Sequence, residues 1–255
     1  IDRAVKWDLG VNFSLNRSKV LVLSEDKDIF GGELDNTILK DQLNLMRVGE
    51  PMYVFYGYVE DGYDENGHIV YKNMDDDPAI TAADKTIIGD PNPDFLVNLT
   101  TAVSYKGFTL SAFFQSSIGN DIYSLSMAAQ AYDYGYNGNT LREVYYNHWT
   151  PENPTAKYPN LDQTSYKMSD RFVYDGSFVR LKNLELAYDV PCARNKFIKR
   201  ARVYVSAQNL FTITSYPFWD PDINANGGGS SMIQGVDSYC YPSARTYTIG
   251  CRLTF

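Results

Sequence analysis

The chain has 255 residues, of which 44% are hydrophobic and 15% aromatic, and its formal net charge is -8. This acidic balance leaves no basic stripe for phosphate groups and excludes nucleic acid as a partner. No apolar run reaches the roughly 18 residues that a transmembrane helix needs, but the strands of a transmembrane β-barrel need only about 9–11 alternating residues.

Six segments of strand length alternate apolar with polar residues. In the second segment, Phe95, Val97 and Leu99 share one face, while Asn98 and Thr100 share the other. A two-residue Lys-Gly link to the third segment predicts a tight hairpin, because Gly readily adopts the positive φ of such turns. The predicted strands cover residues 7–16, 95–105, 108–117, 177–190, 202–213 and 246–255.

The alternation changes phase in two of these segments. Leu184 and Leu186 have even numbers, as do the cations Arg180 and Lys182. A regular strand would therefore place all four side chains on one face. Either a β-bulge near Asn183 shifts the phase, or the two cations lie at a membrane interface. The next segment loses its alternation in its second half.

The lengths of the connections follow a pattern of their own. Two links are short, at 106–107 and 191–201, whereas three are long, at 17–93, 119–175 and 214–245. Long and short links alternate, which predicts an up-and-down antiparallel sheet with short turns at one rim and long loops at the other. Outer-membrane barrels have this asymmetry, and six strands are too few to close one alone. The sequence therefore predicts part of a larger barrel, or a barrel shared between copies.

Several motifs in order along the chain resemble the C-terminal third of the SusC/RagA-type TonB-dependent transporters. They are "GEPMYVFYGYVEDG" at 49–62, "TIIGDPNPDF" at 86–95, "FFQSSIGNDIY" at 113–123, "WTPENPTAKYPNL" at 149–161, "DGSFVRLKNLELAYDVP" at 175–191 and "RVYVSAQNLFTITSYPFWDPD" at 202–222. The resemblance implies an all-β fold, in which residues 1–255 supply the last six strands of a 22-stranded transmembrane barrel with long extracellular loops. It also implies that the N-terminal plug domain and the earlier strands are absent from these residues.

The same resemblance implies a transporter in the outer membrane of a Gram-negative bacterium. Such transporters import oligosaccharides or, in a minority, peptides, with a SusD-like surface lipoprotein as a lid and TonB as the source of energy. No enzymatic activity is expected, because the chain lacks HExxH and GxSxG motifs. Two alternatives remain open, a soluble glycan-binding or glycan-cleaving β-protein and a passive channel built from several copies.

Aromatic side chains in the long connections are the predicted substrate contacts, because sugar rings stack their C–H faces on aromatic rings. Acidic and amide groups beside them could bind the hydroxyls, and packing within the loops or against the lid protein is the alternative role. The residues predicted to bind substrate are Tyr134, Tyr136, Trp149, Tyr216, Trp219 and Asp220. Tyr132, Asp133, Asn137, Phe218 and Asp222 lie beside them in the same connections.

One acidic stretch resembles a calcium loop that many SusC-like proteins carry. Calcium loops place oxygen ligands at positions 1, 3 and 5, a carbonyl at 7 and an acidic side chain at 12. The corresponding residues are Asn73, Asp75, Asp77, Ala79 and Asp84. Because a proline replaces the usual glycine at position 6, a solvated acidic turn is the alternative. The sequence requires no cofactor, and a structural Ca2+ is the one ion this stretch suggests.

Overall fold

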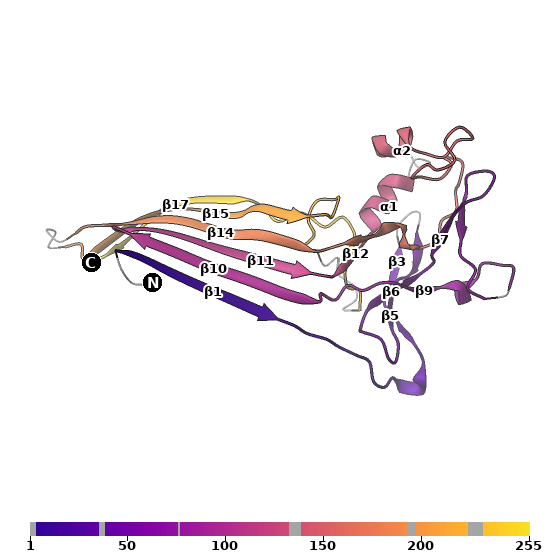
Figure 1. Ribbon diagram of the computed structural model, residues 1–255, viewed down its shortest axis with the longest axis horizontal. Coiled ribbons are helices and arrows are strands. Elements are labelled where there is room, and N and C mark those ends of the chain that lie inside the picture. The colour runs from indigo at the N-terminus through magenta and orange to yellow at the C-terminus, as the bar shows by residue number, and fades with distance from the viewer. Residues whose placement is uncertain (1–3, 36–38, 76, 133–138, 193–196, 224–231) are drawn as a thin grey trace.

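The computed structural model describes residues 4–35, 39–75, 77–132, 139–192, 197–223 and 232–255 (Figure 1). Six long strands form one antiparallel sheet in the order β1-β10-β11-β14-β15-β17. Their bounds are Val5–Ser14 (β1), Phe95–Tyr105 (β10), Phe108–Ile118 (β11), Phe178–Val190 (β14), Arg200–Thr214 (β15) and Thr246–Thr254 (β17). All six overlap the segments that alternation predicts, so the strand prediction is confirmed.

The connections segregate as their lengths predict. The turn between β10 and β11 lies at the same end of the sheet as the link between β14 and β15, and the long connections leave from the opposite end (Figure 1). Lys106 and Gly107 both have positive φ, at 48° and 87°, which matches the tight hairpin expected from the sequence. The predicted two-rim arrangement is therefore present.

The two faces of the sheet differ in chemistry. Residues directly opposite each other in an antiparallel pair lie on the same face. One register row is apolar across all six strands, and it consists of Trp7, Val103, Leu110, Leu186, Val205 and Ile249. A row of opposite parity is polar across five strands, and it consists of Asn12, Asn98, Gln115, Arg180 and Thr212. We call the face of the first row the apolar face and that of the second row the polar face.

The phase change in β14 is a β-bulge. The register of β14 shifts between Leu181 and Asn183 against β15, and a shift at the same place separates its pairs with β11. As a result Arg180 pairs with Gln115 on the polar face, whereas Leu184 pairs with Ala112 on the apolar face. Of the two alternatives that the sequence leaves open, the β-bulge is the one present, because it gives Arg180 and the following leucines opposite faces despite their shared parity.

The long connections 17–93, 119–175 and 214–245 gather at one end of the sheet, and we call them the loop body (Figure 1). The sequence predicts loops here, but the described residues of these connections also form the 3-10 helices Ser24–Asp26, Ala82–Asp84 and Asp170–Phe172, together with short strands and two α-helices. Their bounds are Ile29–Phe30 (β2), Glu33–Asp35 (β3), Lys40–Gln42 (β4), Asn44–Met46 (β5), Val54–Gly57 (β6), Glu60–Tyr63 (β7), Ile69–Tyr71 (β8), Thr86–Gly89 (β9), Asp121–Ser124 (β12), Leu125–Tyr132 (α1), Arg142–Tyr146 (α2), Val173–Asp175 (β13) and Val236–Asp237 (β16). Neither helix, within the described residues, is long and apolar enough to cross a membrane.

The hydrophobic core lies in the loop body and not on the sheet. Its almost fully buried residues include Phe55 from the first connection, Tyr123 and Phe172 from the second, and Val236 from the third. Along the six long strands, by contrast, large apolar side chains of the apolar face stay exposed, with Ile249 at 85%. A face of this kind needs an apolar environment outside the chain, because exposed apolar patches of such extent are rare on soluble monomers.

Candidate functional site

The two tyrosines predicted to bind substrate at positions 134 and 136 lie outside the described residues, as do Asp133 and Asn137. Their neighbour Tyr132 ends helix α1 and is 4% exposed. Its ring stacks on Tyr166 with 3.8 Å between the centroids and meets Phe172 edge to face. The described end of this stretch therefore takes part in the core of the loop body.

Trp149 lies against the β7–β8 hairpin. Its indole ring occupies the space beside Gly67, where a Cβ atom would come within 2.2 Å of the ring. Gly67 also has a φ of +80°, so both the turn and the close approach of the ring require glycine there. Trp149 is only half-buried, which leaves part of the ring accessible.

Tyr216 follows β15 and is 4% exposed. Its hydroxyl donates to the Asp237 carboxylate at 2.5 Å and lies 2.8 Å from the hydroxyl of Ser124. Burial and the neighbouring Asp237 carboxylate raise the pKa of Tyr216, so the phenol stays protonated. The hydroxyl of Tyr216 thus joins β12 to β16, and its part in substrate binding stays a prediction.

Trp219 and Asp220 line a pocket of about 500 Å³ where the polar face of the sheet meets the loop body. Trp219 is 58% exposed and stacks on Phe218, with 4.9 Å between the ring centroids. Phe218 in turn packs against the core of the loop body. The pocket therefore presents a supported aromatic surface, which is the feature that the sequence predicts for sugar binding.

A buried ion pair forms the floor of this pocket. Arg180, whose side chain is 2% exposed, donates from its Nη2 atom to Asp220 and from Nε to Thr212 at 2.9 Å. Its Nη1 atom lies 3.3 Å from an oxygen of Asp222. Burial alone would raise the pKa of Asp220, but the backbone N–H of Ser243, a second backbone N–H and the guanidinium outweigh it and lower that pKa. Asp220 is therefore a carboxylate in a fixed position.

The rest of the pocket lining is not predicted from the sequence, and its cationic and amide side chains are Arg180, Asn209 and Arg245. The sequence identifies Arg180 only as a cation out of phase, and Arg245 carries no sequence signal. Asn209 has a φ of 52° in β15, where the alternation is lost. That loss of alternation is the sequence signal that could have marked Asn209.

The acidic stretch at 73–84 is organised by hydrogen bonds to its own backbone. Side-chain oxygens of Asn73, Asp75 and Asp77 each accept the N–H of the residue two positions later. The two carboxylate oxygens of Asp84 accept the N–H groups of Met74 and Thr81, both at 2.7 Å. Within the described residues no group of three or more His, Cys, Asp or Glu side chains converges as a metal site. The calcium loop stays a prediction.

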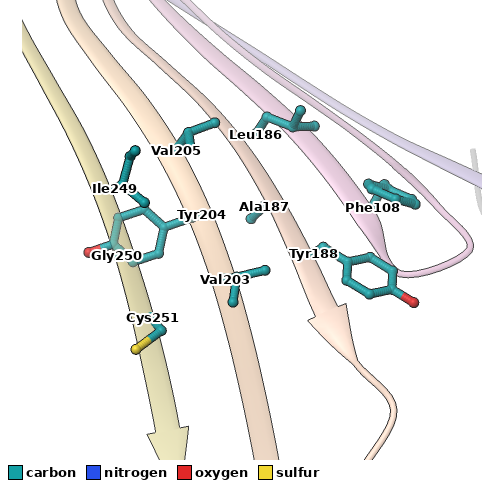
Figure 2. A pocket seen from close by; sticks show the side chains of 10 residues that line it. All are labelled: Phe108, Leu186, Ala187, Tyr188, Val203, Tyr204, Val205, Ile249, Gly250 and Cys251. Atoms are coloured by element: carbon teal, nitrogen blue, oxygen red, sulfur yellow. The ribbon is translucent and has the colours of Figure 1, made fainter.

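A second cavity of about 500 Å³ lies on the opposite face of the sheet (Figure 2). Leu186, Val203, Val205 and Ile249 from three neighbouring strands line it, with Cys251 at its border. Polar side chains contribute little to this groove. Its lining suits an apolar occupant and offers no group that would orient a hydrophilic substrate.

The chain is similar to TonB-dependent receptors over nearly its whole length, although no protein-family model matches it. TonB-dependent receptor P3 of Formosa agariphila is 32% identical over 98% of the chain and 27% of the relative. TonB-dependent receptor SusC of Bacteroides thetaiotaomicron is 28% identical over 98% of the chain and 24% of the relative. The chain thus spans about a quarter of the length of these relatives.

A solved structure described as the RagAB peptide transporter has the same fold. It superimposes with a TM-score of 0.79 at 25% identity, over 99% of this chain and 27% of the other chain. The agreement includes the six-stranded sheet and the loop body, because almost the whole chain is covered. The chain is therefore SusC/RagA-like in sequence and fold over nearly its whole length, and its six-stranded sheet fits a segment of a larger β-barrel.

Proposed function

We propose that the full-length protein imports oligosaccharides across the outer membrane with energy delivered through TonB. The observation that carries the proposal is the similarity to SusC over 98% of the chain. In this role the apolar face of the sheet contacts lipid, and acyl chains fill the groove of Figure 2. The polar face lines the lumen, and the loop body lies at the extracellular mouth.

The 255 residues then form the C-terminal portion of the receptor and supply six of about 22 strands. The share of the relatives that the chain spans, about a quarter, supports this assignment. The plug domain and the contact with TonB belong to the remainder of the protein. A SusD-like surface lipoprotein is the proposed partner of the loop body, as the likeness to SusC and RagA suggests.

Transport of this kind needs binding and gated passage without covalent chemistry. Trp219 would stack on a sugar ring, and the polar groups around it would bind hydroxyls. The supported position of Trp219 on Phe218 favours this use, because a rigid aromatic surface loses little conformational entropy on binding.

Peptide import is the second candidate function. The specific observation in its favour is the fold match with a structure described as a peptide transporter. Peptides offer both apolar side chains for the aromatic surface and amide groups for the polar lining of the pocket.

Uptake by cells tests the proposal. A strain that lacks the gene is compared with the same strain carrying the full-length gene, using a panel of labelled oligosaccharides and peptides. We expect one class of solute to enter only when the gene is present, and a TonB deletion to abolish that entry. Uptake that persists without TonB, or no difference between the strains, would contradict the proposal.

A further inference from the structure

The pocket beneath Trp219 carries an uncompensated positive charge. Its charged lining residues are Arg180, Asp220 and Arg245. The buried pair of Arg180 with Asp220 cancels within the protein. Asp222 lies beside the pair and is shared between Arg180 and Lys182, at 3.3 Å and 4.0 Å. These pairs leave the positive charge of the Arg245 guanidinium unbalanced, in a chain whose net charge is -8.

Arg245 has no carboxylate partner within the part of the chain that the structure describes. Arg245 is exposed directly before β17, where it lines the pocket. Residues 224–231, which lie outside the described ranges, contain no Asp or Glu. An arginine without a partner presents up to five N–H donors in a planar fork that matches a carboxylate.

The pocket offers one further group for a ligand. Trp219 is 58% exposed, and its ring stacks on Phe218, which supports it. Asn209 donates from its Nδ2 atom to the carbonyl of Ala244 at 2.9 Å. This hydrogen bond holds the backbone next to Arg245, so Asn209 helps to position the arginine.

We propose that this pocket selects substrates that carry a carboxylate, with Arg245 as the residue that recognises the charge. Trp219 binds the ring or side chain next to the carboxylate. The inference rests on the proposed import function and narrows its substrate class. Two sources share the chemistry, an oligosaccharide of uronic acids and a peptide with a free C-terminus.

Binding to the purified full-length receptor in detergent tests the proposal with two matched pairs of probes. One pair is tri-galacturonic acid and its neutral methyl ester, and the other is N-acetyl-tri-alanine and its neutral C-terminal amide. We expect the charged member of at least one pair to bind roughly tenfold more tightly, as suits a charge-assisted hydrogen bond. The pair that shows the preference identifies the source of the carboxylate.

The variant Arg245→Gln should remove this preference while the neutral probe binds as before, which also shows that the variant is folded. Arg245→Lys should keep part of it, because the charge remains but the planar fork is lost. Arg142→Gln is the matched control, since Arg142 is an exposed arginine on α2 outside the pocket. Equal binding of the charged and neutral members, no binding of any probe, or a preference that survives in Arg245→Gln would overturn the proposal.

The same variants separate this inference from the import function itself. If uptake of a labelled substrate requires TonB but is unchanged in Arg245→Gln, import stands and the charge selection fails. If uptake does not depend on TonB while the binding preference is lost in Arg245→Gln, the selection stands and the import mechanism fails.

Discussion

Arg180 is the residue at which the sheet and the loop body are joined. It projects from the polar face of β14 and is held by Asp220, Asp222, Thr212 and Ser243. A charge that is 2% exposed is tolerated only with a partner, because its desolvation would otherwise cost several kcal/mol. The position of the loop that carries Trp219 therefore depends on this cluster.

Asp220→Asn should loosen the loop by leaving the guanidinium of Arg180 without its closest partner. Breaking a buried pair in this way costs about 3–5 kcal/mol. We expect faster hydrogen exchange at the amide of Ser243, which donates to Asp220 at 2.9 Å. Asp222→Asn is the control, because Asp222 is 40% exposed and its contact is longer. Equal effects of the two substitutions would show that Asp220 is not the principal partner.

At the scale of elements, the bulge in β14 lets one strand place Arg180 in the lumen and Leu184 in lipid. Inserting one alanine between Leu184 and Glu185 shifts the alternation of β14 by one residue, so that Glu185 turns toward the apolar face when Leu184 keeps its place. Because a charged side chain facing lipid is destabilising, we expect less folded receptor in the outer membrane. Quantification of surface-exposed protein and of heat-modifiable mobility on gels measures this loss.

Deletion of Lys182 serves as the control for that insertion. It removes the extra residue of the bulge and leaves Arg180 and Leu184 three positions apart, so a regular strand still gives them opposite faces. The deletion variant should assemble as the unmodified protein does. Normal assembly of the insertion variant would contradict the assignment of one face of β14 to lipid.

The loop at 73–84 is held by its own hydrogen bonds, so we expect chelation of Ca2+ to leave its protection from hydrogen exchange unchanged. Asp84→Ala should remove that protection, since both oxygens of Asp84 accept backbone N–H groups. These bonds to Met74 and Thr81 lower the pKa of Asp84. Because this pKa is lower in the folded state than in the unfolded state, the ionised carboxylate of Asp84 stabilises the fold above about pH 4. This stabilisation is lost as the pH falls further. Protection that requires Ca2+ would instead support the calcium loop.

The strands were predictable because each has one apolar and one polar face, and its residues therefore alternate between apolar and polar along the sequence. The bulge near Asn183 was one of two explanations that the sequence offered, since an error in the phase of the alternation has few physical causes. The loop body was not, because its core joins residues such as Phe55, Tyr123 and Phe172, which are far apart in sequence. The pocket escaped prediction too, since Asn209 and Arg245 meet only when β15 and the segment before β17 are brought together.

At the scale of the whole molecule, the chain combines two kinds of surface that a soluble domain would not. The apolar face stays exposed from β1 to β17, and the sheet ends on both sides in strands with unpaired edges. The backbone N–H and C=O groups of such edges can pair with further strands, and a closed barrel provides these partners. Lipid around the barrel then covers the apolar face, while the loop body keeps its own core in water.

The most direct test of this account is the environment of successive residues along β10 in the full-length receptor. Single cysteines replace Val97, Asn98, Leu99 and Thr100 in a background without the native cysteines, and each carries a nitroxide label. We expect high accessibility to oxygen in lipid at 97 and 99 and to a water-soluble nickel complex at 98 and 100. Equal accessibility of all four positions to the nickel complex would contradict a membrane barrel and favour a soluble β-protein.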